Sequence, residues 1–153
     1  MNNKIMFSIL KHKTESQNSF QITVVGNSMF PVLKDGDKVL IKKAKEYEVG
    51  SVIVFKYNDE GLLIHRILEI KDGKYYCKGD NCYRLEEVGK NDIIGKVLDI
   101  PSVDIDFINM SLEVNKEFVR NDYDYFKTIE SNIYKKYKQK YLKETTNNEF
   151  SKE

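Results

Sequence analysis

The feature that most constrains the fold is a series of short β-branched runs between residues 21 and 100, separated by turn signals. The runs cover residues 22–25, 39–41, 52–55, 62–70 and 93–94. Gly and Asp stand between them, for example in Asp35-Gly36-Asp37 and Asp72-Gly73. Short apolar runs bounded by Gly and Asp favour strands joined by tight turns. We therefore predict a mainly β domain, a compact coiled sheet or barrel, over residues 21–105.

The segment before this β-rich region predicts a short amphipathic helix. Apolar residues recur in the first half of residues 1–20, and the second half is polar. Because these apolar residues recur at helical spacing, we expect one face of the helix to be apolar.

The segment after the β-rich region also predicts helix. Residues 115–143 contain no Gly or Pro, and apolar and aromatic residues recur there at three- and four-residue steps, which is typical of a long amphipathic helix. We assign residues 106–144 to a C-terminal helical appendage. The polar residues 145–153 are predicted to be a disordered tail.

Charge and hydropathy exclude several classes of protein. The chain has 25 basic and 24 acidic residues, so no strong field attracts nucleic acid, and we expect no nucleic-acid partner. Its apolar runs, such as residues 52–55, are far shorter than the about 20 residues of a membrane-spanning helix. The first ten residues lack the apolar core and cleavage site of a signal peptide. We expect a cytoplasmic protein and leave peripheral contact with a membrane open.

The two cysteines give little evidence of a metal site. Cys77 and Cys82 have no companion His or Cys at zinc-binding spacing. We therefore expect two free thiols in a reducing compartment, and neither a metal nor another cofactor.

One serine stands in a position suited to chemistry. Ser28 follows the run at residues 22–25, with Gly26 before it and Pro31 after it. We expect this arrangement to hold the serine at the end of a strand. Taken alone, Gly-Asn-Ser is a common sequence in turns. The serine therefore indicates a function only if other catalytic groups lie near it.

A hairpin register supplies two such partners. If Asp72-Gly73 forms a two-residue loop, Leu68 pairs with Cys77. The same register places His65 opposite Asp80. Opposed residues have Cβ atoms roughly 4.5 to 5.5 Å apart on one face, which lets a carboxylate reach an imidazole. A bulge or a three-residue loop would break this pairing.

Ser28, His65 and Asp80 together match the parts of a hydrolytic triad. A serine hydroxyl is a poor nucleophile until a base takes its proton, and the base works best when a third group orients it. By itself, His65 would be a core histidine whose charge Asp80 satisfies. His12 is the other histidine, and we expect it to be solvated because lysines flank it.

Four ordered blocks resemble the signal peptidase I superfamily, which shares its fold with the cleavage domains of SOS repressors. They are GNSMFPVLKDGDKVLI, VGSVIVFKY, LLIHRILEI, and YYCKGDNC followed by IIGKVLDI. Any one block is weak evidence, but four in the right order are strong. The resemblance covers about residues 22–100. It implies a coiled β peptidase fold and a serine endopeptidase that cleaves a peptide or a precursor leader.

The dipeptide His65-Arg66 refines this resemblance. Most bacterial members and the repressors have Lys-Arg there, with lysine as the base. The chain is thus similar to the archaeal and endoplasmic-reticulum type, which uses Ser and His with an Asp in the Gly-Asp-Asn block. The resemblance implies Ser28 as nucleophile, His65 as base and Asp80 as the residue that orients the base.

The resemblance also implies an oxyanion hole that includes the backbone N–H of Ser28. Some relatives place a serine donor where this chain has Gly26, so the second donor is unassigned. Glu86 stands where the reticulum type often has an additional acidic residue, and its role is left open. Because the family's usual transmembrane anchor is not found in this sequence, we expect a specialised precursor as substrate.

Two other functions fit the same fold. A catalytically silent peptide-binding module would keep the fold without the chemistry, although the intact trio argues against it. A self-cleaving repressor-type domain would need a DNA-binding module and an Ala-Gly cleavage site. Only about twenty residues precede the β-rich region, and no Ala-Gly occurs. The sequence determines neither the oligomeric state nor the physiological substrate.

Overall fold

The computed structural model describes residues 3–16, 18–120 and 139. The chain divides into two compact units, Met1–Ser102 and Val103–Glu153. The predicted boundary after residue 105 stays a prediction.

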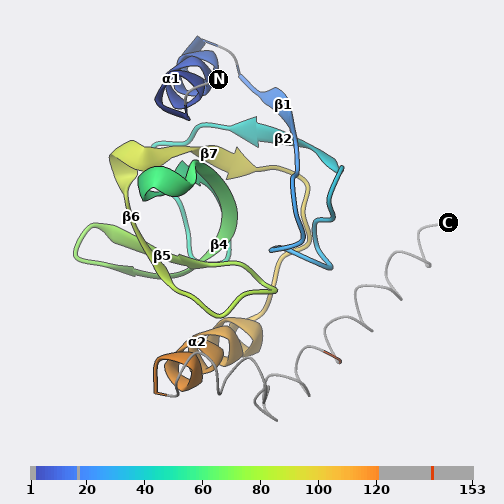
Figure 1. Cartoon of the computed structure of the whole chain (residues 1–153), viewed down its shortest axis with the longest axis vertical. Helices are drawn as coiled ribbons and strands as arrows, with labels where there is room; N and C mark the ends of the chain where they lie inside the picture. Colours follow the sequence, from blue (N-terminus) through green and yellow to red (C-terminus); the bar gives the residue numbers. More distant parts are fainter. Residues whose placement is uncertain (1–2, 17, 121–138, 140–153) are drawn as a thin grey trace, which may run out of the picture. The chain divides into compact units, whose positions relative to one another are not determined.

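The first unit is a helix followed by one curled antiparallel sheet (Figure 1). It contains helix α1 (Asn3–Ser16), strands β1 (Phe20–Thr23), β2 (Lys38–Lys42), β3 (Val52–Lys56), β4 (Leu62–Lys71), β5 (Lys74–Lys78), β6 (Glu86–Gly89) and β7 (Ile93–Val97), and the 3-10 turns η1 (Asn58–Glu60) and η2 (Lys90–Asp92). The strand order is β1-β2-β7-β3-β4-β5-β6. The predicted mainly β fold with a short N-terminal helix and a C-terminal helix is confirmed.

Strands β4 and β5 form the predicted hairpin. Lys71 pairs with Lys74 across Asp72-Gly73. Both loop residues have positive φ, 51° and 73°, as the favoured two-residue hairpin turn requires. The Asp-Gly dipeptide in the sequence therefore predicted this hairpin correctly.

A β-bulge then changes the register of the hairpin. Ile67 pairs with Cys77, so the predicted pairing of Leu68 with Cys77 is wrong. The bulge places Leu68 beside Ile67 in the interior, where their exposed fractions are 2% and 0%. The shift also removes the predicted pairing of His65 with Asp80.

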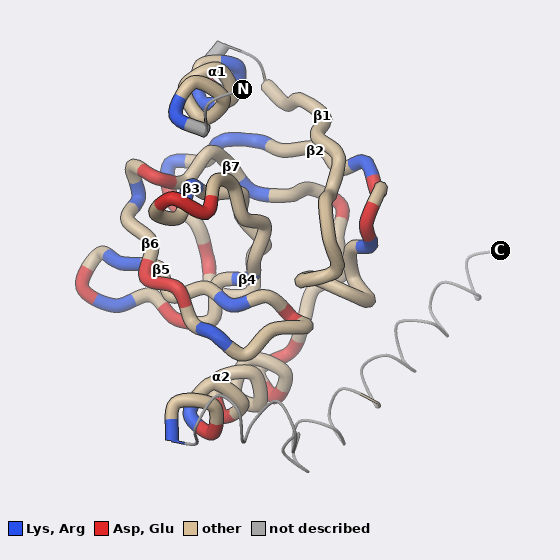
Figure 2. The backbone as a smooth tube through the Cα atoms, in the orientation of Figure 1, with Lys and Arg blue, Asp and Glu red and all other residues tan. Residues whose placement is uncertain are grey.

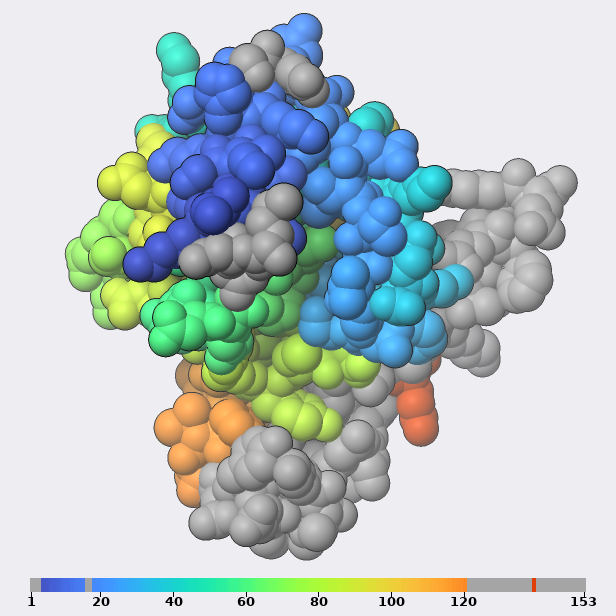
Figure 3. Space-filling model, turned by 45° about the horizontal axis from the view of Figure 1, so that its top comes forward, coloured from blue at the N-terminus to red at the C-terminus, as the bar shows by residue number. Residues whose placement is uncertain are grey.

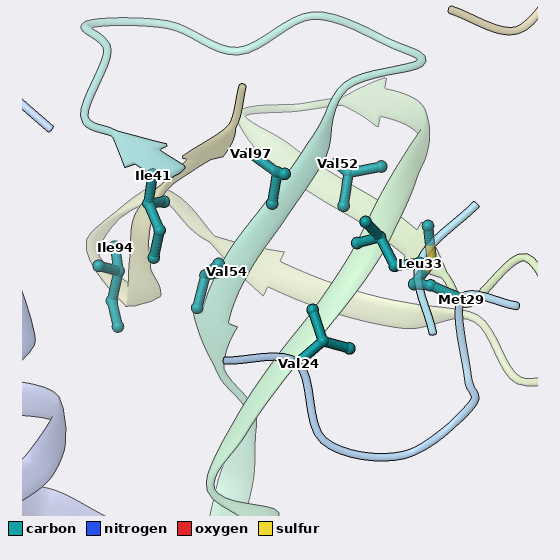
Figure 4. Close-up of a cluster of buried hydrophobic side chains, with 8 residues drawn as sticks. All are labelled: Val24, Met29, Leu33, Ile41, Val52, Val54, Ile94 and Val97. Atoms are coloured by element: carbon teal, nitrogen blue, oxygen red, sulfur yellow. The ribbon is translucent and has the colours of Figure 1, made fainter. Parts of the chain in front are cut away.

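Two clusters of buried side chains fill the first unit. Figure 4 shows one of them, which consists of Val24, Met29, Leu33, Ile41, Val52, Val54, Ile94 and Val97. The other contains Ile53 and Phe55 together with residues of β4, β5, β6 and β7. Alternate residues of β3 therefore enter different clusters, which makes this strand central to the fold.

Helix α2 (Ile105–Arg120) makes up most of the described part of the second unit. The Asp104 carboxylate accepts a hydrogen bond of 2.9 Å from the Phe107 N–H and caps the start of the helix. The helix begins at Ile105, one residue before the predicted appendage of residues 106–144 and ten residues before the Gly- and Pro-free stretch at residues 115–143. Apart from residues 115–120 and 139, the predicted long helix and the predicted disordered tail lie outside the described residues.

Two further features concern charge and hydropathy. Basic and acidic residues are interspersed along the described chain (Figure 2). None of the helices in the described part of the chain has the length and apolar character needed to cross a membrane.

Candidate active site

Ser28 lies in the loop that joins β1 to β2, after the end of a strand as predicted. The loop is held by its own polar groups. Gly26 N–H donates to the Asp35 carboxylate at 2.7 Å, and Val24 N–H donates to the Asp37 carbonyl at 2.8 Å. Gly26 has φ of +86°, a left-handed conformation that glycine adopts without strain. The buried Met29 side chain anchors the other side of the serine in the core.

His65 lies on β4, opposite Ile53 of β3. Its side chain is buried, with 6% of its surface exposed. Its ring and the Phe55 ring form a T-shaped contact, with the ring centroids 6.1 Å apart and an angle of 69° between the ring planes. The strand and the aromatic neighbour therefore fix where the imidazole points.

The hydrogen-bond partner of His65 is Glu86, at the start of β6. His65 Nδ1 lies 2.5 Å from Glu86 Oε1, and the Glu86 side chain is almost fully buried. A carboxylate accepts hydrogen bonds, so it favours a proton on Nδ1 and leaves Nε2 as an acceptor. Glu86 thus occupies the place that we expected for Asp80.

A chain of ion pairs links Glu86 to the surface. Glu86 Oε2 accepts from Arg84 Nε at 3.2 Å. The same guanidinium makes two bonds of 2.7 and 2.8 Å with the Glu60 carboxylate. It also lies over the Tyr57 ring, 5.1 Å from the centroid. These contacts hold both oxygens of Glu86 in place.

Asp80 pairs with Arg66 instead of His65. Arg66 Nε donates to Asp80 Oδ1 at 3.0 Å, and Arg66 Nη2 donates to Oδ2 at 2.9 Å. Both side chains are buried, and Arg66 Nη1 also donates to the Gly50 carbonyl at 2.6 Å. The predicted contact between Asp80 and His65 is therefore wrong. The bulge on β4 shifts the register, and the buried guanidinium next to His65 needs a compensating charge.

The Ser28 loop and His65 meet at Gly79. Asn81 N–H donates to the Ser28 carbonyl at 2.9 Å, and the Asn81 amide donates to the Asn27 carbonyl at 3.0 Å. A β-carbon on Gly79 would lie 2.6 Å from the Ser28 carbonyl oxygen and 3.0 Å from His65 Nε2. The backbone of Ser28 and the free nitrogen of His65 therefore surround one point, which only glycine leaves open.

Among the described residues, the Ser28 hydroxyl forms no hydrogen bond with His65. Catalytic hydrogen bonds are often long without substrate and tighten when it binds. The backbone N–H of Ser28 also has no hydrogen-bond partner within the described part of the chain. Its predicted place in an oxyanion hole stays a prediction.

Comparison with known families identifies the domain. The family model "Peptidase S24-like" matches residues 2–98, which is more than half of the chain. The chain belongs to the Peptidase S24-like family. The match supports membership of the superfamily that includes signal peptidase I and the SOS repressors. No curated protein matches the chain.

In this S24-like protein, Ser28 also borders a pocket of about 430 Å³. The walls come from the end of β1, the start of β4 and helix α1. They contain no charged side chain. The pocket therefore offers an apolar surface directly beside the candidate nucleophile.

The remaining reactive groups of the site are two thiols. Cys77 and Cys82 are both free, and burial raises the pKa of each thiol. The Cys82 thiol donates to the Ser28 carbonyl at 3.8 Å. Among the described residues, no three His, Cys, Asp or Glu side chains are arranged to hold a metal ion.

Besides the family resemblance at its position, the sequence had one further sign of Glu86. Residues at alternate positions of a strand share a face, so Glu86 lies on the same face as the apolar Val88. Both are buried, whereas Glu87 between them is exposed. A carboxylate on the buried face of a strand needs a partner, and the pattern alone does not say which one.

Proposed function

We propose that this chain is a serine endopeptidase of the signal-peptidase type, which cleaves a peptide or a precursor leader. The observation that supports this most strongly is the arrangement of His65. Nδ1 is bound by the buried Glu86, while Nε2 faces the backbone of Ser28 at Gly79. A carboxylate on Nδ1 and an Nε2 close to the serine are two of the features that a general base requires.

The reaction would proceed in two steps. Ser28 Oγ attacks the carbonyl carbon of the scissile bond, and its proton passes to His65 Nε2. The C–N bond breaks when His65 returns this proton to the amine, leaving an ester on Ser28. Water then attacks the ester, with His65 again taking and returning the proton. The Ser28 N–H stabilises the oxyanion in both steps.

Glu86 replaces Asp80 in this mechanism. Its carboxylate orients His65 and stabilises the imidazolium that forms during each step. Asp80 instead neutralises Arg66 and holds the Gly79–Asn81 turn against the Ser28 loop. Asp80 is therefore a structural residue in this account.

The identity of the candidate base, residue 65, supports a finer placement within the superfamily. Histidine at position 65, followed by arginine, resembles the archaeal and endoplasmic-reticulum type of signal peptidase rather than the lysine-dependent members. The second oxyanion donor stays unassigned. For the partner we propose a polypeptide rather than nucleic acid, because basic and acidic residues are nearly balanced.

A serine-reactive fluorophosphonate probe tests the proposal. We expect the wild-type protein to be labelled at Ser28, Ser28→Ala to lose labelling, and His65→Ala to lose most of it. Ser102→Ala is a matched control because Ser102 lies outside the site, and it should be labelled like the wild type. Labelling that survives in Ser28→Ala contradicts the assignment.

The same experiment separates the alternatives. A silent peptide-binding module would show no Ser28-dependent labelling but would still retain peptides. A self-cleaving domain would convert its own chain into two fragments in a Ser28-dependent reaction, which an intact-mass measurement detects. Cleavage of added peptides by an otherwise intact chain supports the endopeptidase.

A further inference from the structure

Arg84 lies at the surface, and its guanidinium ends a chain of contacts that begins at the buried His65 imidazole. Arg84 Nε donates to Glu86 Oε2 at 3.2 Å, while His65 Nδ1 binds the other oxygen of the same carboxylate. The Arg84 side chain is 46% exposed, whereas those of Glu86 and His65 are 1% and 6% exposed. A charge at the surface is therefore two hydrogen bonds away from the candidate base.

Glu60, in the turn η1 between β3 and β4, fixes the position of this guanidinium. Its carboxylate accepts hydrogen bonds from Arg84 Nη1 at 2.7 Å and from Arg84 Nη2 at 2.8 Å, a two-point contact that restricts rotation. The Tyr57 ring packs against the same guanidinium. Figure 3 shows green atoms of the region around residue 60 near lime-green atoms of the region around residue 80. We call Arg84 and Glu60 the surface pair.

Glu86 is shared between two cations whenever His65 is protonated. A carboxylate beside an imidazole favours the protonated ring, and a second cation on that carboxylate disfavours it. Hydrogen bonding to Arg84 and, less strongly, the charge of His65 lower the pKa of the Glu60 carboxyl. The surface pair and the imidazole are therefore coupled electrostatically. This coupling affects turnover because a general base must be neutral to accept a proton.

The other ionisable groups near the imidazole are held by partners of their own. Arg66, the next residue on β4, is bound by Asp80, so their charges cancel. The Lys78 amine on β5 donates to two backbone carbonyls of the turn that follows. Burial raises the pKa of the Cys82 thiol in that turn, so the thiol is neutral near pH 7. On the β3 side, the imidazole packs against the carbon ring of Phe55. These groups keep their charges when the surface pair is altered.

We propose that the surface pair holds the Glu86 carboxylate against His65 and sets the pH range in which His65 acts as a base. The inference rests on the proposed peptidase function. Arg84 and Glu60 are positioning residues, since neither touches the reacting atoms. Arg84 restrains the carboxylate and weakens its attraction for the imidazole proton. Glu60 limits this effect because it neutralises part of the guanidinium charge.

Two variants that break the same ion pair should then act in opposite directions. Arg84→Met removes a cation, which favours the imidazolium, so activity should be lost at a higher pH than in the wild type. Glu60→Gln removes an anion, so the loss of activity should move to lower pH. We expect each shift to be roughly 0.5 to 1.5 pH units, as for one unit charge near a protein surface. An ion pair with a merely structural role would give the same effect from either side.

Two readouts measure these shifts. The first is the rate at which the fluorophosphonate labels Ser28 across the pH range from about 5 to 9. The second is an NMR titration of the His65 ring, which requires no activity. His12 on α1 serves as an internal reference in the same spectra. Circular dichroism shows whether each variant is folded.

Lys43 and Glu15 form a matched control pair, with side chains that are 44% and 48% exposed. In the described part of the chain, neither has a hydrogen bond or an ion pair with His65 or Glu86. Lys43→Met and Glu15→Gln should therefore leave both profiles within about 0.2 pH unit of the wild type. Arg84→Lys keeps the charge but not the planar two-point contact. It should keep the position of the labelling profile on the pH axis and lower its maximum several-fold.

The outcomes separate this inference from the peptidase proposal. Opposite shifts in both readouts support the two together. Labelling of Ser28 with shifts that are absent, or that run in the same direction, overturns the inference and leaves the peptidase proposal standing. Opposite shifts of the His65 titration without any labelling support the electrostatic role of the surface pair and contradict the peptidase proposal. A result with neither labelling nor opposite shifts contradicts both.

Discussion

Glu86 and Asp80 are both buried carboxylates near His65, but their partners differ. Glu86 accepts from the imidazole and from Arg84, whereas Asp80 is bound on both oxygens by Arg66. A carboxylate that orients a catalytic imidazole contributes to turnover. One that neutralises a buried guanidinium contributes to the free energy of unfolding. Substituting each by its amide therefore separates the two roles.

For Glu86→Gln we predict that turnover falls by roughly 10² to 10⁴, while the protein stays folded. An amide at this position removes the charge that stabilises the imidazolium, and it can donate to Nδ1 and so hold the wrong tautomer. Steady-state cleavage of a peptide substrate, with circular dichroism as the folding control, measures this effect. Wild-type turnover in Glu86→Gln would remove Glu86 from the mechanism.

For Asp80→Asn we predict a loss of about 3 to 5 kcal/mol in the free energy of unfolding, because the buried Arg66 loses its counter-charge. Urea denaturation of the variant and the wild type checks this value. The exposed pair of Lys43 and Glu15 offers a control, since Glu15→Gln should change stability by less than about 1 kcal/mol. If Asp80→Asn is as stable as the wild type, the proposed structural role is wrong.

The two thiols should react slowly in the folded protein. Burial raises the pKa of both Cys77 and Cys82, which lowers the fraction of reactive thiolate near pH 8. A disulfide reagent that releases a coloured thiolate should modify them more slowly in buffer than in guanidinium chloride. Rapid modification of Cys82 in the native state would show that the thiol beside the Ser28 carbonyl is ionised.

Among the elements, the contact between the Ser28 loop and the turn after β5 decides whether the site assembles. Three hydrogen bonds from Asp80 and Asn81 reach the loop, from backbone and amide donors to Asn27, Ser28 and the Met29 sulfur. Gly79 leaves the space in which the loop and the imidazole approach each other. Added volume at this position has to displace one of them.

For Gly79→Ala we predict a loss of about 1 to 3 kcal/mol in stability and a larger loss of activity, because the new methyl group clashes with the Ser28 carbonyl and with His65. Probe labelling and urea denaturation measure the two effects. Gly89→Ala is a matched control, since a β-carbon there has its nearest neighbour 3.6 Å away. Full labelling of Gly79→Ala would contradict the proposed meeting point.

The same elements show which features the sequence can predict. The Asp72-Gly73 turn and the β-branched runs predicted the hairpin and most strands, because both signals are local. Strand β6 was not predicted, since its sequence Glu86-Glu87-Val88-Gly89 has no β-branched run. The bulge at Leu68 could not be predicted either, because packing of the finished core decides it. That single shift moved Asp80 away from His65, although the choice of Ser28 and His65 did not depend on it.

At the scale of the whole molecule, the candidate site belongs to one unit. The buried residues of both hydrophobic clusters lie between Val24 and Val97. The family match ends at residue 98, and the first unit ends at Ser102. Both clusters and the candidate site residues therefore lie within residues 1–102.

We predict that a fragment of residues 1–102 folds cooperatively and reacts with the fluorophosphonate probe at a rate similar to that of the full chain. Thermal unfolding followed by circular dichroism, together with labelling rates, tests this. A fragment that lacks a cooperative transition would show that residues 103–153 are needed for folding. A folded but unlabelled fragment would show that they are needed for the site.

The most direct test of the account is a crystal structure of the protein after reaction with the fluorophosphonate. The account predicts phosphorus bonded to Ser28 Oγ, His65 Nε2 within hydrogen-bonding distance of the adduct, and Nδ1 still bound to Glu86. An adduct on another residue, or an imidazole turned away from Ser28, would contradict it.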